Sequence, residues 1–202
     1  MLCMGLALAL CALQLVPAAL AGPQPQLLVE RSGARRLSKL QVRGFSWENC
    51  GPNDPVVVQS LSLSPDPIRF PGRLTVSARV SVQKNVTSPV WVKLSVKKYV
   101  VFFWTPLPCI NNIGSCTYND FCEVIDMIFQ PGVPCPNELT NNGIPCHCPF
   151  KKGSYNLPST TFDLPNVPLP SFLASGRYYI HAVAKIGGQE LTCLKMELSL
   201  KT

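Results

Sequence analysis

The chain has 202 residues and a formal net charge of +7, and hydrophobic residues make up 47% of it. Outside the first 21 residues, no stretch approaches the ~20 consecutive apolar residues that a membrane-spanning helix needs. Composition therefore excludes a protein with several membrane spans, and the length is enough for one soluble domain with a sizeable core.

The N-terminus has the pattern of a secretory signal peptide over residues 1–21. This segment carries no charge, has an apolar run from Leu2 to Val16, and ends in the small-x-small sequence Ala19-Leu20-Ala21. An uncleaved membrane anchor is the alternative, and the cleavage pattern disfavours it. Export would place the chain in an oxidising compartment.

Residues 22–43 form a basic leader with a net charge of +4. The leader is rich in polar, glycine and proline residues, and Arg35-Arg36 offers a processing site. We expect it to be a propeptide or disordered, because a secretory signal argues against a nucleic-acid-binding arm. The charge of +3 that remains on residues 44–202 suits an anionic lipid surface, where each nearby Lys or Arg contributes ~1 kcal/mol.

Alternation with a period of two predicts half-buried antiparallel strands over residues 56–63, 73–82 and 90–97. Trp91 falls on the polar face of the last strand, which makes it a candidate for lipid or membrane contact. Asn85 begins an Asn-x-Thr sequence between two strands and is a predicted glycosylation site. The apolar positions that we expect to face inward are Leu74, Val76, Val80, Val82, Val92, Leu94 and Val96.

A short helix is predicted over about residues 118–128, where apolar residues recur at helical spacing ahead of a Pro-Gly pair. Asp120, Glu123 and Asp126 point away from the apolar stripe, and we interpret them as a solvated helix face rather than a catalytic carboxylate pair. The sequence has two histidines and no phosphate-binding loop, nucleophile elbow or zinc-protease motif. We therefore predict no catalytic residue and no cofactor.

Residues 162–173 combine prolines with apolar side chains. Pro165, Pro168 and Pro170 are incompatible with a central strand or a helix. Side chains this apolar either fold back as a lid on the core or form an exposed lipid-binding or membrane surface, and both interpretations stay open. The apolar residues concerned are Phe162, Leu164, Val167, Leu169, Phe172 and Leu173.

Two further strands are predicted over residues 180–186 and 194–200. Ile180, Met196 and Leu198 belong to their apolar faces. Gly187-Gly188 lies between these strands and can supply the positive φ of a tight hairpin. The fold class that these segments indicate is mostly β and antiparallel.

Eight cysteines remain once the signal peptide is removed, and an even number in an exported chain indicates disulfides. Eight cysteines allow about a hundred pairings, among which the sequence does not choose. Cys146, His147 and Cys148 are adjacent, but their spacing differs from the paired Cys-x-x-Cys knuckles of a zinc site. We expect no metal there, and we expect His147 to be a surface or packing residue.

Seven runs of the sequence, taken together, carry a resemblance to a known family. They are FSWENC at 45–50, SLSLSPDPI at 60–68, GSCTYNDFCEVIDM at 114–127, PCP at 134–136, GIPCHCPFKKGSY at 143–155, LPNVPLPSFLASGRYYI at 164–180 and LTCLKMELSLK at 191–201. In these runs the chain resembles the ganglioside GM2 activator family from about Phe45 to its end. Trp104 also matches that family, whereas Phe172 stands where the family has Trp, and Asn85 is not at the family's usual glycosylation site.

The resemblance implies an all-β fold, an antiparallel β-cup whose apolar faces enclose a lipid-sized cavity, with one short helix. The inward-facing strand positions named above would then face the cavity. The resemblance also implies four disulfides, which would join Cys50 to Cys193, Cys109 to Cys116, Cys122 to Cys148 and Cys135 to Cys146.

The function implied by the resemblance is that of a lysosomal lipid-binding cofactor with no catalysis of its own. Apolar rim segments, with Trp91, Trp104 and residues 162–173 as candidates, would enter an anionic membrane while basic residues hold its surface. The tails of a ganglioside would enter the cup, and β-hexosaminidase A would cleave the displayed sugar.

Two other classes of function stay open. A secreted lipid carrier or lipid-sensing module would have the same cup but no hydrolase partner. A disulfide-rich inhibitor or receptor ligand would hold no lipid at all. An enzyme has the least support in the sequence.

Overall fold

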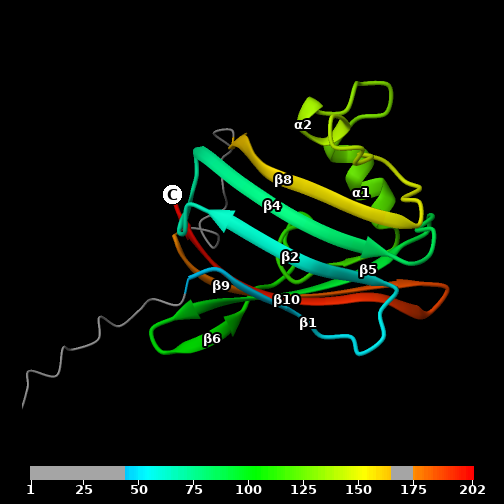
Figure 1. Ribbon diagram of the computed structural model, residues 1–202. Coiled ribbons are helices and arrows are strands. Elements are labelled where there is room, and N and C mark those ends of the chain that lie inside the picture. The colour runs from blue at the N-terminus through cyan, green and yellow to red at the C-terminus, as the bar shows by residue number, and fades with distance from the viewer. Residues whose placement is uncertain (1–43, 165–174) are drawn as a thin grey trace, which may run out of the picture. The chain divides into compact units, whose positions relative to one another are not determined.

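The computed structural model describes residues 44–164 and 175–202 (Figure 1). The predicted signal peptide and basic leader lie outside the described residues, as do Val167, Leu169, Phe172 and Leu173 of the apolar segment. Within the described part of the chain, no helix is both long enough and apolar enough to cross a bilayer.

The described residues form ten strands and two short helices. In chain order these are β1 (Ser46–Asn49), β2 (Val56–Ser64), β3 (Ile68–Arg69), β4 (Gly72–Val82), β5 (Trp91–Val100), β6 (Phe103–Pro106), β7 (Thr117–Tyr118), α1 (Phe121–Ile128), α2 (Asn137–Thr140), β8 (Gly153–Leu164), β9 (Gly176–Ile186) and β10 (Gln189–Lys201).

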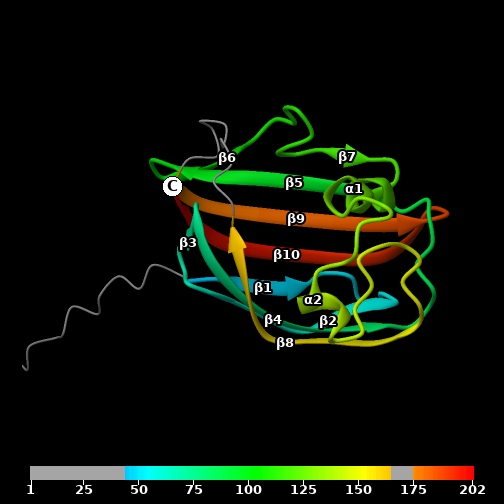
Figure 2. The ribbon, with the colours of Figure 1, turned by 90° about the horizontal axis from the view of Figure 1, so that it is seen from above.

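The strands form two sheets, which lie as two layers in Figure 1 and are seen from above in Figure 2. The first sheet has the order β1-β10-β9-β5-β6, with β3 paired to β10 and β7 paired to β5. The second sheet has the order β2-β4-β8. All strand pairs are antiparallel except that of β10 with β3, so the predicted antiparallel all-β class is confirmed.

The period-two pattern gives the first sheet one apolar face and one polar face. Leu94 of β5 lies opposite Ala182 of β9, and Ala182 lies opposite Leu194 of β10. Because side chains alternate along a strand, the adjacent Lys93 and Lys195 point to the other side. We call the apolar side, which faces the second sheet, the inner face, and the polar side the outer face.

The hairpin between β9 and β10 turns on the glycine pair that the sequence indicates. Gly187 has a φ of 55° and Gly188 a φ of 81°. Residues with a Cβ rarely adopt such positive φ values, whereas glycine adopts them without steric cost. The predicted hairpin is confirmed, and it sets the register in which Met196 lies opposite Ile180.

The helix α1 begins later than the predicted residue 118. Thr117 and Tyr118 instead form β7, which pairs with β5. Asp120 then caps the helix, because its carboxylate accepts hydrogen bonds from the backbone N–H groups of Cys122 and Val90, each at 3.0 Å. This cap ties the start of α1 to the start of β5.

The strand β8 corrects one prediction. Phe162 and Leu164 were expected in an apolar loop, but both lie in β8, opposite Leu74 and Gly72 of β4. Leu164 is the last residue of β8 and the last described residue before the gap at 165–174. Pro158 is tolerated inside β8 because this strand is at the edge of its sheet and the register with β4 shifts between Val76 and Ala78.

Four disulfides stabilise the described unit, in the pairs that the resemblance implies. They join Cys50 to Cys193, Cys109 to Cys116, Cys122 to Cys148 and Cys135 to Cys146. The first connects residues 143 positions apart, from the end of β1 to β10. The last two anchor α1 and the segment around α2, which otherwise contribute few buried side chains.

Among the described residues, two clusters of buried apolar side chains are found rather than one continuous core. The larger contains Val82, Val86, Val90, Val92, Cys122, Ala184 and Leu191. The smaller contains Val96, Leu107 and Tyr178. Tyr178 is 2% exposed, and burial raises the pKa of its phenol to about 12, so the hydroxyl stays neutral at physiological pH.

Candidate functional site

A cavity of about 460 Å³ lies beside the larger buried cluster. Both sheets, α1 and the disulfide-linked segment before β8 contribute to its wall. The lining residues are Val56, Val80, Val82, Val86, Val90, Val92, Leu94, Phe121, Cys122, Ile125, Ile144, Cys148, Phe150, Tyr155, Ala182, Ala184, Leu191 and Thr192. The wall is almost wholly apolar, and its volume is within the range of about 300–1,000 Å³ that small-molecule sites occupy.

Four of the predicted inward-facing residues line this cavity, namely Val80, Val82, Val92 and Leu94. Three others, Val96, Ile180 and Leu198, belong to the smaller cluster around Tyr178. Leu74 and Val76 lie further along β4, and Met196 lies opposite Ile180 and Trp47.

Much of the apolar inner surface stays accessible between the two sheets. Inward positions along the strands are half-buried rather than buried, and they include Leu61, Leu63, Leu74, Val76, Phe162, Ile180, Leu194, Met196 and Leu198. In a closed sandwich the two inner faces interdigitate and bury such side chains. Among the described residues, the two sheets therefore leave part of the hydrocarbon surface of their inner faces accessible.

Alternation along the predicted strands did not identify the cavity residues that lie outside those strands. Phe121 and Ile125 come from α1, and Ile144 and Phe150 come from the segment that two disulfides anchor. The helical spacing of Phe121 and Ile125 is the signal that was available for α1. Ile144 and Phe150 are brought in by the cysteine pairing, which no periodicity shows.

An exposed apolar tip closes the hairpin of β5 and β6. Val100, Val101, Phe102 and Phe103 are 40%, 69%, 84% and 61% exposed. We call these four residues the hairpin tip. Trp104, directly after the tip, is a predicted rim residue, but the sequence patterns did not single out the tip itself, although an uncharged apolar run at a turn would have indicated it.

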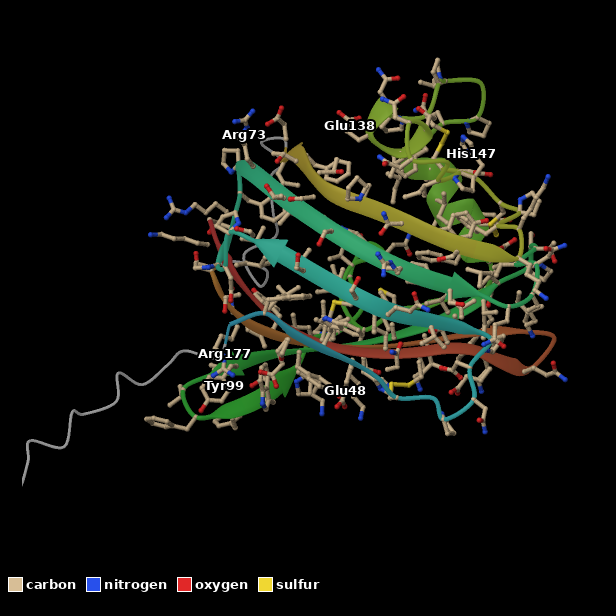
Figure 3. The ribbon with its side chains drawn as sticks, in the orientation of Figure 1. Glu48, Arg73, Tyr99, Glu138, His147 and Arg177 are labelled. Atoms are coloured by element: carbon tan, nitrogen blue, oxygen red, sulfur yellow. A yellow bond between two sulfur atoms is a disulfide. The ribbon has the colours of Figure 1, made fainter. Side chains whose placement is uncertain are left out.

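Aromatic and cationic side chains follow directly behind the hairpin tip. The rings of Tyr99 and Trp104 are 5.3 Å apart, and the Arg177 guanidinium lies 5.2 Å and 5.6 Å from them. Tyr99 and Arg177 are labelled in Figure 3. Further along β5 and β9 from the tip, the Lys97 ammonium lies 5.7 Å from the ring of Tyr179. From the tip back along the hairpin, side chains are first apolar, then aromatic, then cationic, and this order matches the layers of a membrane interface.

The other predicted contact residue, Trp91, lies at the far end of β5 from the hairpin tip. It is half-buried on the outer face, and the Lys185 ammonium lies 5.6 Å from its ring. It does not line the apolar cavity.

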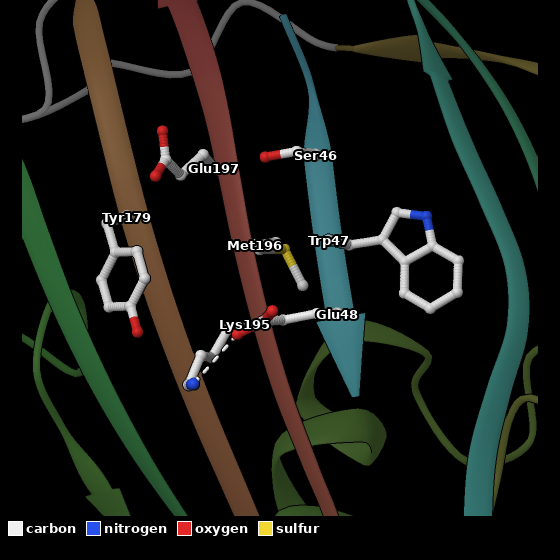
Figure 4. Close-up of a pocket in the computed structure, with 7 residues that line it drawn as sticks. All are labelled: Ser46, Trp47, Glu48, Tyr179, Lys195, Met196 and Glu197. Atoms are coloured by element: carbon white, nitrogen blue, oxygen red, sulfur yellow. Dashed lines mark hydrogen bonds and ion pairs between the residues drawn. The ribbon is translucent and has the colours of Figure 1, made fainter. Parts of the chain in front are cut away.

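A second hollow, of about 240 Å³, lies over β1, β9 and β10 (Figure 4). Its lining residues are Ser46, Trp47, Glu48, Tyr179, Lys195, Met196 and Glu197. The Lys195 ammonium donates to Glu48 at 2.9 Å, and this hydrogen bond raises the pKa of Lys195. The mixture of charges makes this hollow unsuited to a hydrocarbon chain.

The adjacent Cys146, His147 and Cys148 do not form a ligand set in this structure. Both cysteines are in disulfides, so neither offers a thiolate. The Nδ1 of His147 lies 2.8 Å from Asp126 Oδ1, which attaches the histidine to α1. Asn85 is exposed between β4 and β5, and its Oδ1 accepts the backbone N–H of Lys152 at 2.8 Å. Its glycosylation stays a prediction.

Comparison with known proteins places this arrangement in a family. The model of the ML domain family matches residues 44–200. A ganglioside GM2 activator of Mus musculus is 45% identical over 168 residues, which cover 83% of this chain and 86% of that protein. A ganglioside GM2 activator of Macaca fascicularis is 47% identical over 158 residues, covering 78% and 83%.

A more distant relative has a different name. The phosphatidylglycerol/phosphatidylinositol transfer protein of Mycosarcoma maydis is 27% identical over 159 residues, covering 77% of this chain and 66% of that protein. The family match over residues 44–200 and the two relatives at 45% and 47% identity lead to one conclusion: the chain belongs to the ML domain family, as a relative of the ganglioside GM2 activators.

Proposed function

We propose that this protein is a non-enzymatic lipid-transfer and activator protein. It extracts a ganglioside from a membrane and presents the head group to lysosomal β-hexosaminidase A, which cleaves the terminal sugar. The observation that supports this most directly is the apolar cavity of about 460 Å³, together with inner sheet faces whose side chains are only half-buried. The names of the relatives from Mus musculus and Macaca fascicularis support the choice of ganglioside.

The energetics of extraction favour a cavity over a surface patch. A two-tailed lipid has roughly 30 chain carbons, and each contributes ~0.8 kcal/mol to its partition into a membrane, so full exposure of the tails costs more than ~20 kcal/mol. An exposed patch would cover only one side of a tail. Inner faces on both sheets can enclose a tail and offset most of this cost.

The hairpin tip is the proposed membrane contact among the described residues. Its Phe102 and Phe103 would enter the acyl region, with Tyr99 and Trp104 at the level of the head groups. Lys97 and Arg177 would then face anionic lipid phosphates, each contributing ~1 kcal/mol near the surface. Residues 162–173 stay a second proposed contact, of which residues 162–164 are described, all in β8.

The cavity chemistry supports binding without catalysis. Its described lining residues include no carboxylate and no imidazole, Cys122 and Cys148 form a disulfide with each other, and the hydroxyl of Tyr155 donates to the Lys151 carbonyl at 2.7 Å. General acid–base catalysis needs a titratable group within hydrogen-bonding reach of the reacting atom. We therefore propose that the bond cleavage takes place in the partner enzyme.

The four disulfides of the described unit are typical of proteins that pass through the secretory pathway. A lysosomal destination follows from the proposed partner rather than from the fold. It is tested by locating the protein in cells, where colocalisation with β-hexosaminidase A is expected.

The decisive experiment measures cleavage of ganglioside GM2 in anionic vesicles by purified β-hexosaminidase A, with and without the protein. We expect cleavage to rise with protein concentration, and we expect native mass spectrometry to find one lipid per chain. Lipid binding without stimulation would instead support a carrier that has no hydrolase partner, an alternative that the transfer-protein relative favours. A chain that takes up no lipid would contradict both.

A further inference from the structure

A second exposed apolar surface lies at the end of α1, away from the hairpin tip. Met127, Ile128 and Val133 are 65%, 67% and 57% exposed. Ile128 and Val133 line a groove of about 270 Å³ together with Phe129 and Pro134, and Met127 directly precedes Ile128. We call Met127, Ile128 and Val133 the helix patch. Clusters of large exposed apolar side chains are uncommon on soluble proteins, and they often mark an interaction site.

The helix patch and the lipid cavity share one helix. Phe121, Cys122 and Ile125 line the cavity from one side of α1, whereas Met127 and Ile128 at its C-terminal end face solvent. A molecule seated on the helix patch would therefore lie next to the cavity without entering it. The two sites are adjacent, but a residue of the helix patch can be substituted without changing the lining of the cavity.

The position of α1 separates the helix patch from the proposed membrane contact. In both Figure 1 and Figure 2, α1 lies at one end of the described sheets and the hairpin of β5 and β6 lies at the other. When the hairpin tip contacts a membrane, the helix patch is consequently at the far end and open to a soluble molecule.

The charges around the helix patch are also unlike those of a membrane-binding surface. The sequence has no lysine or arginine from Tyr99 to Phe150. Glu123 and Glu138 are exposed, and Asp126 is paired with His147. An anionic bilayer attracts cations and repels such a surface. A partner that complements it presents apolar side chains with Lys or Arg around them.

Disulfides hold the helix patch in place before any partner binds. Cys122 joins α1 to Cys148, and Cys135, two residues after Val133, joins Cys146. A preformed surface loses little conformational entropy on association, which favours binding.

We propose that the helix patch is the docking surface for the soluble glycosidase, through an apolar region of that enzyme bordered by basic residues. This inference rests on the proposed function and adds the surface through which the partner is recognised. Docking at α1 brings the enzyme beside the cavity that is proposed to hold the lipid, because Phe121, Cys122 and Ile125 of the same helix line that cavity.

The test separates docking from extraction. The full chain is first loaded with ganglioside GM2, and the purified complex is given to β-hexosaminidase A without vesicles. For Ile128→Asp, and separately for Val133→Asp, we expect at least about a tenfold weaker binding to the immobilised enzyme and a matching loss of cleavage at limiting protein. Uptake of lipid from vesicles should stay at the wild-type level, because neither side chain lines the cavity.

Phe102→Asp is the matched control, an exposed apolar residue changed in the same way at the other end. It should reduce uptake from vesicles but leave binding and cleavage of the preloaded complex unchanged. Wild-type binding by both helix-patch variants would overturn the inference, as would loss of vesicle uptake in place of enzyme binding. If wild-type protein docks on the enzyme but never raises cleavage, the proposed function fails while the docking surface stands.

Discussion

Asp120 connects three parts of the chain through one carboxylate. It accepts hydrogen bonds from the N–H groups of Val90 and Cys122 and from the hydroxyl of Ser88. Burial raises its pKa, but these hydrogen bonds outweigh burial and hold the pKa of Asp120 below its usual value. A folded-state pKa that is lowered adds stability above the unfolded pKa, and this stability is lost as the pH falls through the folded pKa.

Asp120→Ala should lower the free energy of unfolding by about 1–2 kcal/mol at pH 7, because α1 loses its cap and β5 loses a partner for Val90. The difference from wild type should shrink as the pH falls below about 4, the usual pKa of an aspartate. Urea denaturation at several pH values measures this. Asp120→Asn keeps an acceptor oxygen and should cost less, and an equal loss at every pH would contradict the role of the charge.

Gly51 illustrates a residue whose only requirement is space. A Cβ built there would lie 2.0 Å from Asp54 Oδ2, and that carboxylate accepts the N–H of Cys193 at 2.6 Å. Asp54 is buried, so moving its carboxylate would leave the carboxylate and the Cys193 N–H without this hydrogen bond. Gly51→Ala should therefore cost about 1–3 kcal/mol of stability in urea denaturation.

Gly153→Ala is the matched control, because nothing lies within 4 Å of a Cβ at that position. It should change stability by less than about 0.5 kcal/mol. Similar losses for the two variants would show that the contact with Asp54 is not the cause.

At the scale of single elements, the hairpin of β5 and β6 is proposed to act as a membrane anchor. Phe102 is 84% exposed and its side chain supports no core, so its replacement leaves the fold intact. Phe102→Asp should weaken binding to anionic vesicles by about tenfold or more, because burying a phenylalanine side chain contributes about 1.5–3 kcal/mol and a new charge is repelled. Vesicle sedimentation measures binding, and circular dichroism confirms folding.

Elements also show where sequence patterns were informative. Alternation predicted the strands β4, β5, β9 and β10, and Gly187 and Gly188 predicted the turn between β9 and β10. The placement of Phe162 and Leu164 in β8 did not follow from alternation, because the nearby Pro165 suggested a loop, whereas an edge strand tolerates proline. The roles of Phe172 and its neighbours stay predictions.

The cavity was predictable in kind but not in extent. Alternation assigns side chains such as Val80 and Leu94 to a face, but it carries no information on the separation of two sheets. Residues such as Ile144 reach the cavity only because disulfides fold a distant segment over it, and pairing among eight cysteines is not encoded in local spacing.

At the scale of the whole molecule, the disulfide between Cys50 and Cys193 has the largest effect on the unfolded chain. It closes a loop of 143 residues in sequence separation, against 7 for the disulfide between Cys109 and Cys116. In the chain-entropy model these contribute about 5 and about 2.5 kcal/mol. Replacing both cysteines of each pair by alanine should therefore destabilise the first variant roughly twice as much as the second in urea denaturation. Equal losses would contradict the loop-length account.

The half-buried inner faces have a consequence for how the molecule behaves without cargo. Water that contacts Leu63, Val76 and Met196 in the vacant state is released when an acyl chain takes its place. A guest that binds the native form alone shifts the folding equilibrium toward it, so occupancy should raise the melting temperature. The melting behaviour of a preparation would then report the fraction of its protein molecules that carry bound lipid.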